Sequence, residues 1–224
     1  MAKALDSSAM LCLSCNKPGV NRCSGCSNGR YCSAQCQKQD WKQHKAICGA
    51  FSTLTERPSP DYIRAMLFPV NEDKPNFVWI KRYTSWFHGY KAEAEWGPLL
   101  GNPENCETGF FDRHYGFRRP LDGNKSIILK YNATFAIDGS PCNQSMKNLK
   151  GIQQARKWCG SFIAHGYYEK DEELVTTLDL DTNDLGALVE YFNVRVDTIP
   201  ECCLPGSPYT CADGMRDACK KKDV

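Results

Sequence analysis

Eight residues between positions 12 and 48 have the types and the spacing of metal ligands. Seven are cysteines and one is a histidine, and they form four close pairs: Cys12 and Cys15, Cys23 and Cys26, Cys32 and Cys36, and His44 and Cys48. Zinc prefers thiolate and imidazole ligands, and four of them complete one tetrahedral site. Eight ligands therefore predict two zinc ions. No position is left open for water, so we expect the metal to be structural rather than catalytic.

Short local elements must bring these pairs together. Two residues separate the members of each of the first two pairs, which is the spacing of a tight knuckle. The last two pairs are each spaced i and i+4, which places both side chains on one face of a helix. We predict a helix over residues 34–45, with Ser33 as its N-cap and Gly49 as its stop.

A hairpin is predicted just before this helix. The dipeptide Asn28-Gly29 is typical of a tight turn, and it lies between short strand candidates near residues 22–23 and 31–32. A segment of this size cannot bury enough apolar surface to fold unaided. Metal binding is therefore expected to supply most of its folding free energy, on the order of 10 kcal/mol or more for each structural site.

Spacing alone does not decide how the four pairs combine. Together with Arg30-Tyr31-Cys32 and the run from Gln37 to Lys45, the cysteine pattern closely resembles the MYND finger family. That resemblance implies a cross-brace, in which alternate pairs share a metal. One zinc would be held by Cys12, Cys15, Cys32 and Cys36, and the other by Cys23, Cys26, His44 and Cys48.

The same resemblance implies a groove for peptides. In MYND fingers that bind proline-containing peptides of the Pro-x-Leu-x-Pro type, the groove is formed by the serine of a Cys-Ser-Gly-Cys knuckle and by a glutamine and a tryptophan of the helix. The matching residues here are Ser24, Gln37 and Trp41. The peptide would add as a strand along the hairpin and pack its leucine and prolines on Trp41. The alternative is that Trp41 only covers the small core.

Charge argues against a nucleic-acid-binding regulator, which we keep as an alternative. The whole chain has a formal net charge of +2 over 224 residues. Residues 12–48 contain six basic side chains and one acidic one, but two zinc ions add four positive charges and seven thiolates remove seven, which leaves +2. Lys38, Lys42 and Lys45 form a stripe on the predicted helix, which is typical of a solvated face. Phosphate contacts there would be unselective.

The chain changes character after the cysteine-rich segment. We predict a MYND-type zinc finger over residues 10–50, a linker over 51–60, an α+β domain of unknown function over 61–197, and a tail containing cysteines and lysines over 198–224. The predicted fold class is therefore α+β, with a small cross-braced two-zinc finger followed by an α+β domain.

Apolar runs separated by turn signals predict the elements of the second region. Residues 62–68 and 77–80 predict a hairpin, and 126–131 and 161–165 are further strand candidates. Asp181 or Thr182 is a candidate N-cap for a helix that follows. Its apolar positions have the spacing that suits packing on a sheet: Leu185, Leu188, Val189 and Phe192. The stretch 119–141 is also similar in general character to the region that follows the finger in small MYND proteins of filamentous fungi, which implies no known activity.

No arrangement of residues in the second region predicts catalysis, and we predict no catalytic residues. His88, His114 and His165 are scattered, without metal-spaced partners or a nucleophile motif. Some MYND fingers lie inside SET-type lysine methyltransferases, but the chain has no Asn-His-Ser-Cys run, and residues 170–174 lack the glycine of the Gly-Glu-Glu-Leu motif. P-loop and dinucleotide fingerprints are also missing. We therefore favour an adaptor over an enzyme or regulatory domain of unknown chemistry that uses the finger as a targeting module.

The two ends of the chain contain sequence signals that relate to its cellular compartment. The amino terminus has no apolar signal segment, and no stretch is long enough to cross a membrane, which predicts an intracellular protein in the nucleus or cytoplasm. Lys220-Lys221-Lys222 is a weak nuclear signal. The tail cysteines lack knuckle spacing, so we expect thiols there rather than a third metal site: Cys202, Cys203, Cys211 and Cys219. The partners implied by the resemblance are proteins with proline-containing peptides, such as transcriptional regulators.

Overall fold

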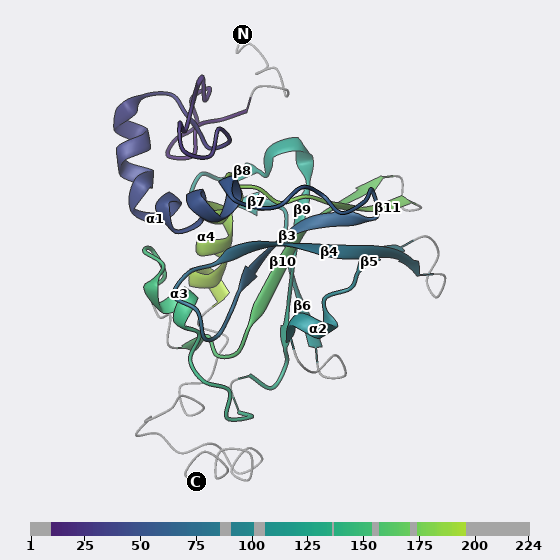
Figure 1. The fold of residues 1–224 in the computed structure, drawn as a ribbon. Helices are drawn as coiled ribbons and strands as arrows, with labels where there is room; N and C mark the ends of the chain where they lie inside the picture. The colour runs from purple at the N-terminus through teal and green to yellow at the C-terminus, as the bar shows by residue number, and fades with distance from the viewer. Residues whose placement is uncertain are drawn as a thin grey trace.

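The computed structural model describes residues 10–85, 91–100, 106–135, 137–153, 157–170 and 174–195. Two parts are joined by one helix, α1 (Ala34–Ser52), as Figure 1 shows: the finger at residues 12–48 and a seven-stranded sheet with its own helices. The α+β fold class is confirmed. Among the described helices, none has both the length and the apolar character that crossing a membrane requires.

The finger contains the predicted hairpin, but its turn differs from the prediction. Strands β1 (Asn21–Arg22) and β2 (Arg30–Tyr31) pair antiparallel. The loop between them is closed by hydrogen bonds from Cys23 N to Gly29 O at 2.8 Å and from Ser27 N to Cys23 O at 2.8 Å. Ser27, with a φ of 55°, takes the left-handed conformation that we expected at Asn28-Gly29. The longer loop is needed because it must also direct two cysteines to a metal.

Helix α1 begins as predicted and ends later than predicted. The Ser33 hydroxyl accepts a hydrogen bond from Cys36 N at 3.3 Å, which confirms the N-cap. The helix then continues through Gly49 to Ser52. Ile47 is fully buried in the core of the sheet, and Phe51 packs against that core. Burial of these side chains offsets the low helix propensity of glycine, which costs about 1 kcal/mol.

The sheet has the strand order β11-β5-β4-β3-β10-β9-β6. Its strands are β3 (Tyr62–Phe68), β4 (Asn76–Ser85), β5 (Lys91–Ala94), β6 (Cys106–Phe111), β9 (Ser126–Asn132), β10 (Phe162–Lys170) and β11 (Leu174–Leu178). All pairs are antiparallel except β5 with β11. The predicted hairpin is confirmed as β3 and β4, and the other two predicted strands as β9 and β10. Because β11 pairs with both β5 and β10, five strands form a closed circuit.

Shorter elements complete the second part. They are α2 (Gly97–Leu100), β7 (Arg113–His114), β8 (Arg119–Pro120), the 3-10 helix η2 (Asp122–Asn124), α3 (Gln144–Asn148) and α4 (Leu185–Arg195). The predicted last helix is therefore α4, and it begins at Leu185, two or three residues later than a cap at Asp181 or Thr182 would place it. Asp181 and Asp184 explain the delay, because the Asp184 carboxylate accepts a hydrogen bond from Asp181 N at 2.8 Å and holds a turn there.

Two apolar clusters lie on opposite faces of the sheet. The larger one includes α4 and the end of α1, and it is rich in aromatic rings that meet edge to face. The four predicted apolar positions of α4 are all buried in it. The smaller cluster joins Ile63, Ile80 and Ile163 to partly buried Leu99 and Leu100 of α2. The larger cluster connects the finger helix to the sheet.

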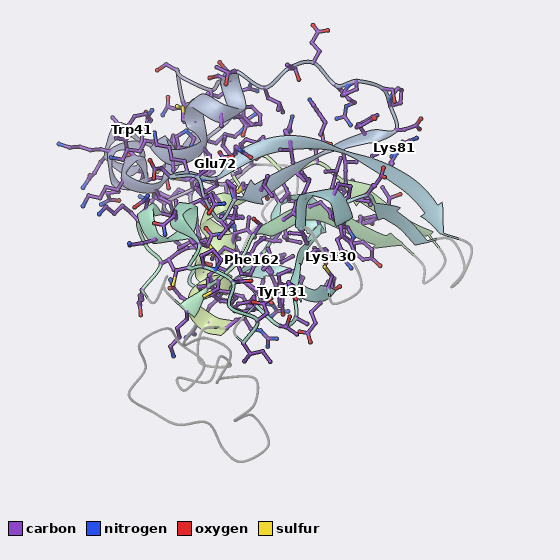
Figure 2. The ribbon with its side chains drawn as sticks, turned by 60° about the horizontal axis from the view of Figure 1, so that its bottom comes forward. Trp41, Glu72, Lys81, Lys130, Tyr131 and Phe162 are labelled. Carbon is purple, nitrogen blue, oxygen red and sulfur yellow. The ribbon has the colours of Figure 1, made fainter. Side chains whose placement is uncertain are left out.

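Substitution of Phe162 tests how much the larger cluster contributes to stability. Phe162 is fully buried on β10, and its ring lies 5.5 Å from the rings of Phe135 and Trp158 and 5.7 Å from that of Tyr131, its cross-strand neighbour (Figure 2). We expect Phe162→Ala to lower the free energy of unfolding by about 3–5 kcal/mol in urea denaturation, because truncation removes contacts and leaves a cavity. Val194→Ala, at a half-exposed position of α4, should change it by less than about 0.5 kcal/mol.

Candidate zinc centres and the face around Trp41

The eight predicted ligands converge in two groups of four. Within each group the ligand atoms all lie within 4.8 Å of one another. Alternate pairs share a group, as the cross-brace requires. The first group is Cys12, Cys15, Cys32 and Cys36, and the second is Cys23, Cys26, His44 and Cys48.

The sulfur separations of the first group fit a zinc ion. The Sγ atom of Cys32 lies 3.5 Å from those of Cys15 and Cys36, and the Sγ atoms of Cys15 and Cys36 are 4.0 Å apart. Four thiolates in a tetrahedron with Zn–S bonds of about 2.3 Å have sulfur atoms about 3.8 Å apart. Zinc here has four thiolate ligands, and the site carries a net charge of about −2.

The second group is the more deeply buried one. The Sγ atoms of Cys23 and Cys48 are 3.7 Å apart, and Sγ of Cys26 is 3.5 Å from Nε2 of His44. All four residues are buried. Burial, followed by the neighbouring cysteines, raises the pKa of the Cys48 thiol to about 12, so a thiolate there depends on a bound cation. Burial also lowers the pKa of His44, which favours the neutral imidazole that binds metals. The prediction of two zinc ions is confirmed.

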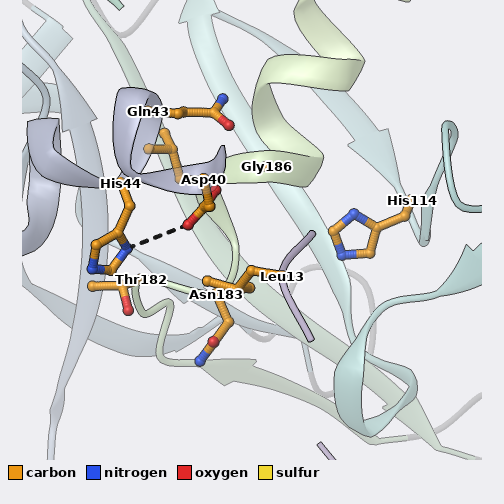
Figure 3. A pocket seen from close by; sticks show the side chains of 9 residues that line it. Leu13, Asp40, Gln43, His44, His114, Thr182, Asn183 and Gly186 are labelled. Atoms are coloured by element: carbon orange, nitrogen blue, oxygen red, sulfur yellow. Dashed lines mark ion pairs between the residues drawn. The ribbon is translucent and has the colours of Figure 1, made fainter. Parts of the chain in front are cut away.

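Asp40 lies near the ring nitrogen of His44 that does not face the second ligand group. The Nδ1 atom of His44 lies 3.9 Å from Oδ2 of Asp40, the pair that is drawn with a dashed line in Figure 3. The same carboxylate accepts a hydrogen bond from the Tyr31 hydroxyl at 2.6 Å. Burial raises the pKa of Asp40, which the hydrogen bond from Tyr31 opposes. No hydrogen bond joins Nδ1 of His44 to Asp40 at this separation, so the carboxylate lies beside the ring without fixing it, and Nδ1 has no hydrogen-bond partner among the residues that the structure describes.

Two glycines leave room for the second group. A Cβ atom on Gly29 would lie 2.8 Å from Cε1 of His44, and one on Gly25 would lie 2.9 Å from Sγ of Cys48. Both separations are shorter than real Cβ contacts, so any side chain would displace a ligand. The dipeptide Asn28-Gly29 indicated only a turn, whereas the main role of Gly25 and Gly29 is to let the knuckle approach the helix.

The knuckle of the second group docks on the segment before α4. The Asn28 side-chain oxygen accepts hydrogen bonds from Thr182 N at 3.2 Å, from the Thr182 hydroxyl at 2.6 Å and from Asn183 Nδ2 at 3.1 Å. The Thr182 hydroxyl also lies 3.9 Å from Sγ of Cys26. Asn28 therefore connects the metal site to the α+β domain, a role that a single sequence could not reveal because its partners are more than 150 positions away.

The first group meets the domain at Arg119. This guanidinium is buried on β8, and its Nη2 atom donates to the Cys12 carbonyl oxygen at 3.5 Å. Its Nε and Nη1 atoms have no hydrogen-bond partner among the residues that the structure describes. Burial lowers the pKa of Arg119, and the neighbouring Asp122 and Cys12 partly offset this effect. A buried cation beside a site with a net charge of about −2 is electrostatically favourable.

The three predicted peptide-binding residues lie on the knuckle of the second group and on α1. Ser24 is exposed on the knuckle, Gln37 is half-buried on α1, and Trp41 lies one turn further along that helix. Trp41 is 46% exposed, and its ring centroid is 6.1 Å from that of His44. A tryptophan that only covered a core would be largely enclosed. Of the described strands, only β2 pairs with β1, so the outer edge of β1 is open.

The two described histidines considered for catalysis, His114 and His165, have different partners. His165 is buried on β10, with Nδ1 3.0 Å from the Gly166 carbonyl oxygen. His114 is buried on β7, with Nδ1 3.6 Å from Oε2 of Glu190. It lines a hollow between the finger and α4 together with His44, as Figure 3 shows; the other lining residues are Leu13, Asp40, Gln43, Thr182, Asn183, Leu185 and Gly186. His88 and the four tail cysteines lie outside the described residues.

Comparison with known families agrees with this geometry. The sequence model of the family described as MYND finger matches residues 12–48, the segment that holds both ligand groups. Residues 12–48 are a MYND finger. MYND fingers are protein-interaction modules, so a role in contacts between proteins is supported for this part of the chain.

Three curated relatives match parts of the chain. Tudor domain-containing protein 1 of Oryzias latipes is 39% identical over 62 residues, which are 25% of this chain and 6% of that protein. Protein CBFA2T2 of Xenopus laevis is 41% identical over 47 residues, 21% of this chain and 8% of that protein. N-lysine methyltransferase SMYD2 of Homo sapiens is 24% identical over 122 residues, 50% of this chain and 27% of that protein. The chain thus spans about a quarter or less of these relatives, and no solved structure matches it.

Gly29→Ala should weaken the second zinc site. The added methyl group would push against the His44 ring, so we expect the affinity for one of the two zinc ions to fall on the order of tenfold or more in a competition titration with a chelator. Gly49→Ala is the matched control, because nothing lies within 4 Å of its new Cβ atom. That helix variant should keep both affinities and gain up to about 1 kcal/mol of stability. Equal zinc affinities in the two variants would show that His44 does not need the space beside Gly29.

Asn28→Ala should loosen the finger from the domain. It leaves the backbone N–H and the hydroxyl of buried Thr182 without this acceptor, while Asn183 Nδ2 keeps Asp181 Oδ1, so the free energy of unfolding of the zinc-loaded protein should fall by about 1–3 kcal/mol in urea. Asn21→Ala, at an exposed position of β1, should change it by less than about 0.5 kcal/mol. An unchanged unfolding midpoint for Asn28→Ala would show that the finger is not held through this contact.

Proposed function

We propose that the protein is an adaptor whose finger binds proline-containing peptides of the Pro-x-Leu-x-Pro type in partner proteins. Ser24, Gln37 and Trp41 would form the binding face. The observation that carries this proposal is Trp41, which is 46% exposed on a helix whose backbone is fixed by metal ligands on one side and by the sheet core on the other. Nothing in the described fold requires an exposed tryptophan at this position.

The proposed binding mode follows from two features of the finger. The open edge of β1 offers backbone groups for a peptide that adds as a third strand, which supplies affinity with little dependence on sequence. Trp41 offers a flat apolar surface for proline and leucine side chains, which supplies selectivity. Because α1 is held rigidly, little conformational entropy is lost when the peptide binds.

The partners and the compartment follow from the resemblance. Transcriptional regulators with proline-containing segments are the class of partner it implies, and they would be met in the nucleus or the cytoplasm. The domain predicted over residues 61–197 would fix the orientation of the finger and offer a second contact surface. The zinc ions act structurally in this proposal, because each ligand group already supplies four protein ligands.

The alternative function is an enzyme or regulatory domain that the finger targets to its substrate. The similarity to N-lysine methyltransferase SMYD2 favours it, since it extends over 122 residues and thus well beyond the finger. The pair of His114 and Glu190 beside the hollow also favours it. Three polar groups of the hollow are engaged elsewhere, however: His44 faces the second ligand group, Asp40 accepts from Tyr31, and Thr182 donates to Asn28.

Calorimetric titration of the full-length, zinc-loaded protein with a Pro-x-Leu-x-Pro peptide tests the adaptor function. We expect saturable binding that Trp41→Ala weakens by about 2 kcal/mol or more, as for a central aromatic residue of an interface, and that Ser24→Ala weakens less. Phe110→Ala is the matched control, because Phe110 is another exposed aromatic residue, at 55%, on β6 of the sheet. Each variant must still hold two zinc ions. No binding up to millimolar peptide would remove this function.

A further inference from the structure

The exposed charges of the finger have one sign. Residues 12–48 contain six basic side chains, Lys17, Arg22, Arg30, Lys38, Lys42 and Lys45, and a single acidic one, Asp40. That carboxylate is turned inward, with its side chain 13% exposed, and it accepts the Tyr31 hydroxyl. None of the six basic side chains forms an ion pair with an acid within the described ranges. The finger therefore presents unpaired cations and no carboxylate to its surroundings.

Helix geometry places two of these cations beside Trp41. Lys38 precedes Trp41 by three positions and Lys45 follows it by four, so both lie on the neighbouring turns of the same face. All three side chains are exposed. The Trp41 ring also lies beside His44 of the second ligand group, with 6.1 Å between the ring centroids. A ligand lying on Trp41 thus meets lysines along the solvent side of the ring.

The hairpin carries cations on the strand that would receive the peptide. Arg22 of β1 is directly opposite Arg30 of β2. Like charges in this arrangement are unfavourable in a two-stranded sheet, and a negative group nearby relieves the repulsion. The Arg22 guanidinium is exposed and donates only a long hydrogen bond, 3.4 Å, to the Ser27 carbonyl oxygen. Both sides of the proposed groove are therefore positively charged.

We propose that the peptide bound at Trp41 carries aspartate or glutamate residues next to its proline-containing core. This inference rests on the proposed function and specifies its ligand. The acidic residues pair with Lys38 and Lys45 at one end of the core and with Arg22 at the other. Such exposed pairs act mainly on specificity and on the association rate, and they weaken with salt.

The charge distribution favours an acidic peptide over a nucleic acid. The second metal site lies next to Trp41, whose ring centroid is 6.1 Å from that of His44, and with bound zinc its net charge is about −1 for three thiolates and an imidazole. A long polyanion would extend past Trp41 over this site and be repelled by it. A short peptide places its few carboxylates only where the lysines and the arginine lie. Its apolar core also uses Trp41, which a phosphate backbone does not.

Three peptides with one proline-containing core and different flanks test the inference. Their flanking residues are glutamate, glutamine or lysine, and each peptide is titrated into the full-length, zinc-loaded protein. We expect the glutamate peptide to bind about three- to tenfold more tightly than the glutamine peptide at 50 mM salt, and the lysine peptide to bind most weakly. The difference should shrink at 500 mM salt, where the screening length is much shorter.

Charge reversal on the protein provides the matched test. In a variant with both Lys38→Glu and Lys45→Glu, the preference should invert towards the lysine peptide, while two zinc ions remain bound. Lys81→Glu is the control, because Lys81 is an exposed lysine on β4, on the opposite side of the molecule from Trp41 in Figure 2. It should leave the order of the three affinities unchanged.

The possible outcomes separate this inference from the function on which it rests. If all three peptides bind equally, the proposed preference for acidic flanks is wrong, but peptide binding at Trp41 is retained. If none binds, the peptide groove itself is wrong and the inference falls with it. If a single-stranded oligonucleotide binds more tightly than the glutamate peptide and displaces it, the basic surface is a nucleic-acid site, and the inference is overturned.

Discussion

Consecutive residues of helix α1 face two different environments, and the rest of the structure depends on this arrangement. His44 and Cys48 point to the second ligand group, whereas Ile47, between them, is fully buried in the core of the sheet. Neighbouring positions on a helix are about 100° apart, so one helix can serve both sides. The finger cannot rotate without either breaking metal ligation or unpacking the core. Its orientation relative to the sheet is therefore fixed by metal ligation and core packing along one helix rather than by a flexible connection.

Electrostatic balance explains which charges lie inside and which lie outside. The thiolate groups are anionic even with bound zinc, and the domain supplies a buried cation, Arg119, against the first group. The only carboxylate of the finger, Asp40, lies near His44. The remaining cations have no described internal partner and stay on the surface. The same internal requirements thus produce a cationic exterior around Trp41.

The sequence predicted the parts of this structure that depend on local spacing. The two ligand groups and four strands of the sheet were correctly expected from spacing, resemblance and apolar pattern. The end of α1 was wrong because burial of Ile47 in a distant core overrides the glycine that follows. The start of α4 was wrong because side chains of the preceding turn compete for its backbone. Asn28 and Arg119 were missed because their partners lie more than 100 positions away, and a single sequence carries no signal of such contacts.

The contact between Asn28 and Thr182 has a thermodynamic consequence. Thr182 lies next to Sγ of Cys26 and immediately precedes α4, so the geometry of the second metal site and the folding of the sheet domain share the same hydrogen bonds. Two equilibria coupled in this way are reciprocal: each favours the other by the same factor. The folded domain therefore acts as a positive effector of zinc uptake, and the chain retains this ion more tightly than a detached finger with identical ligands.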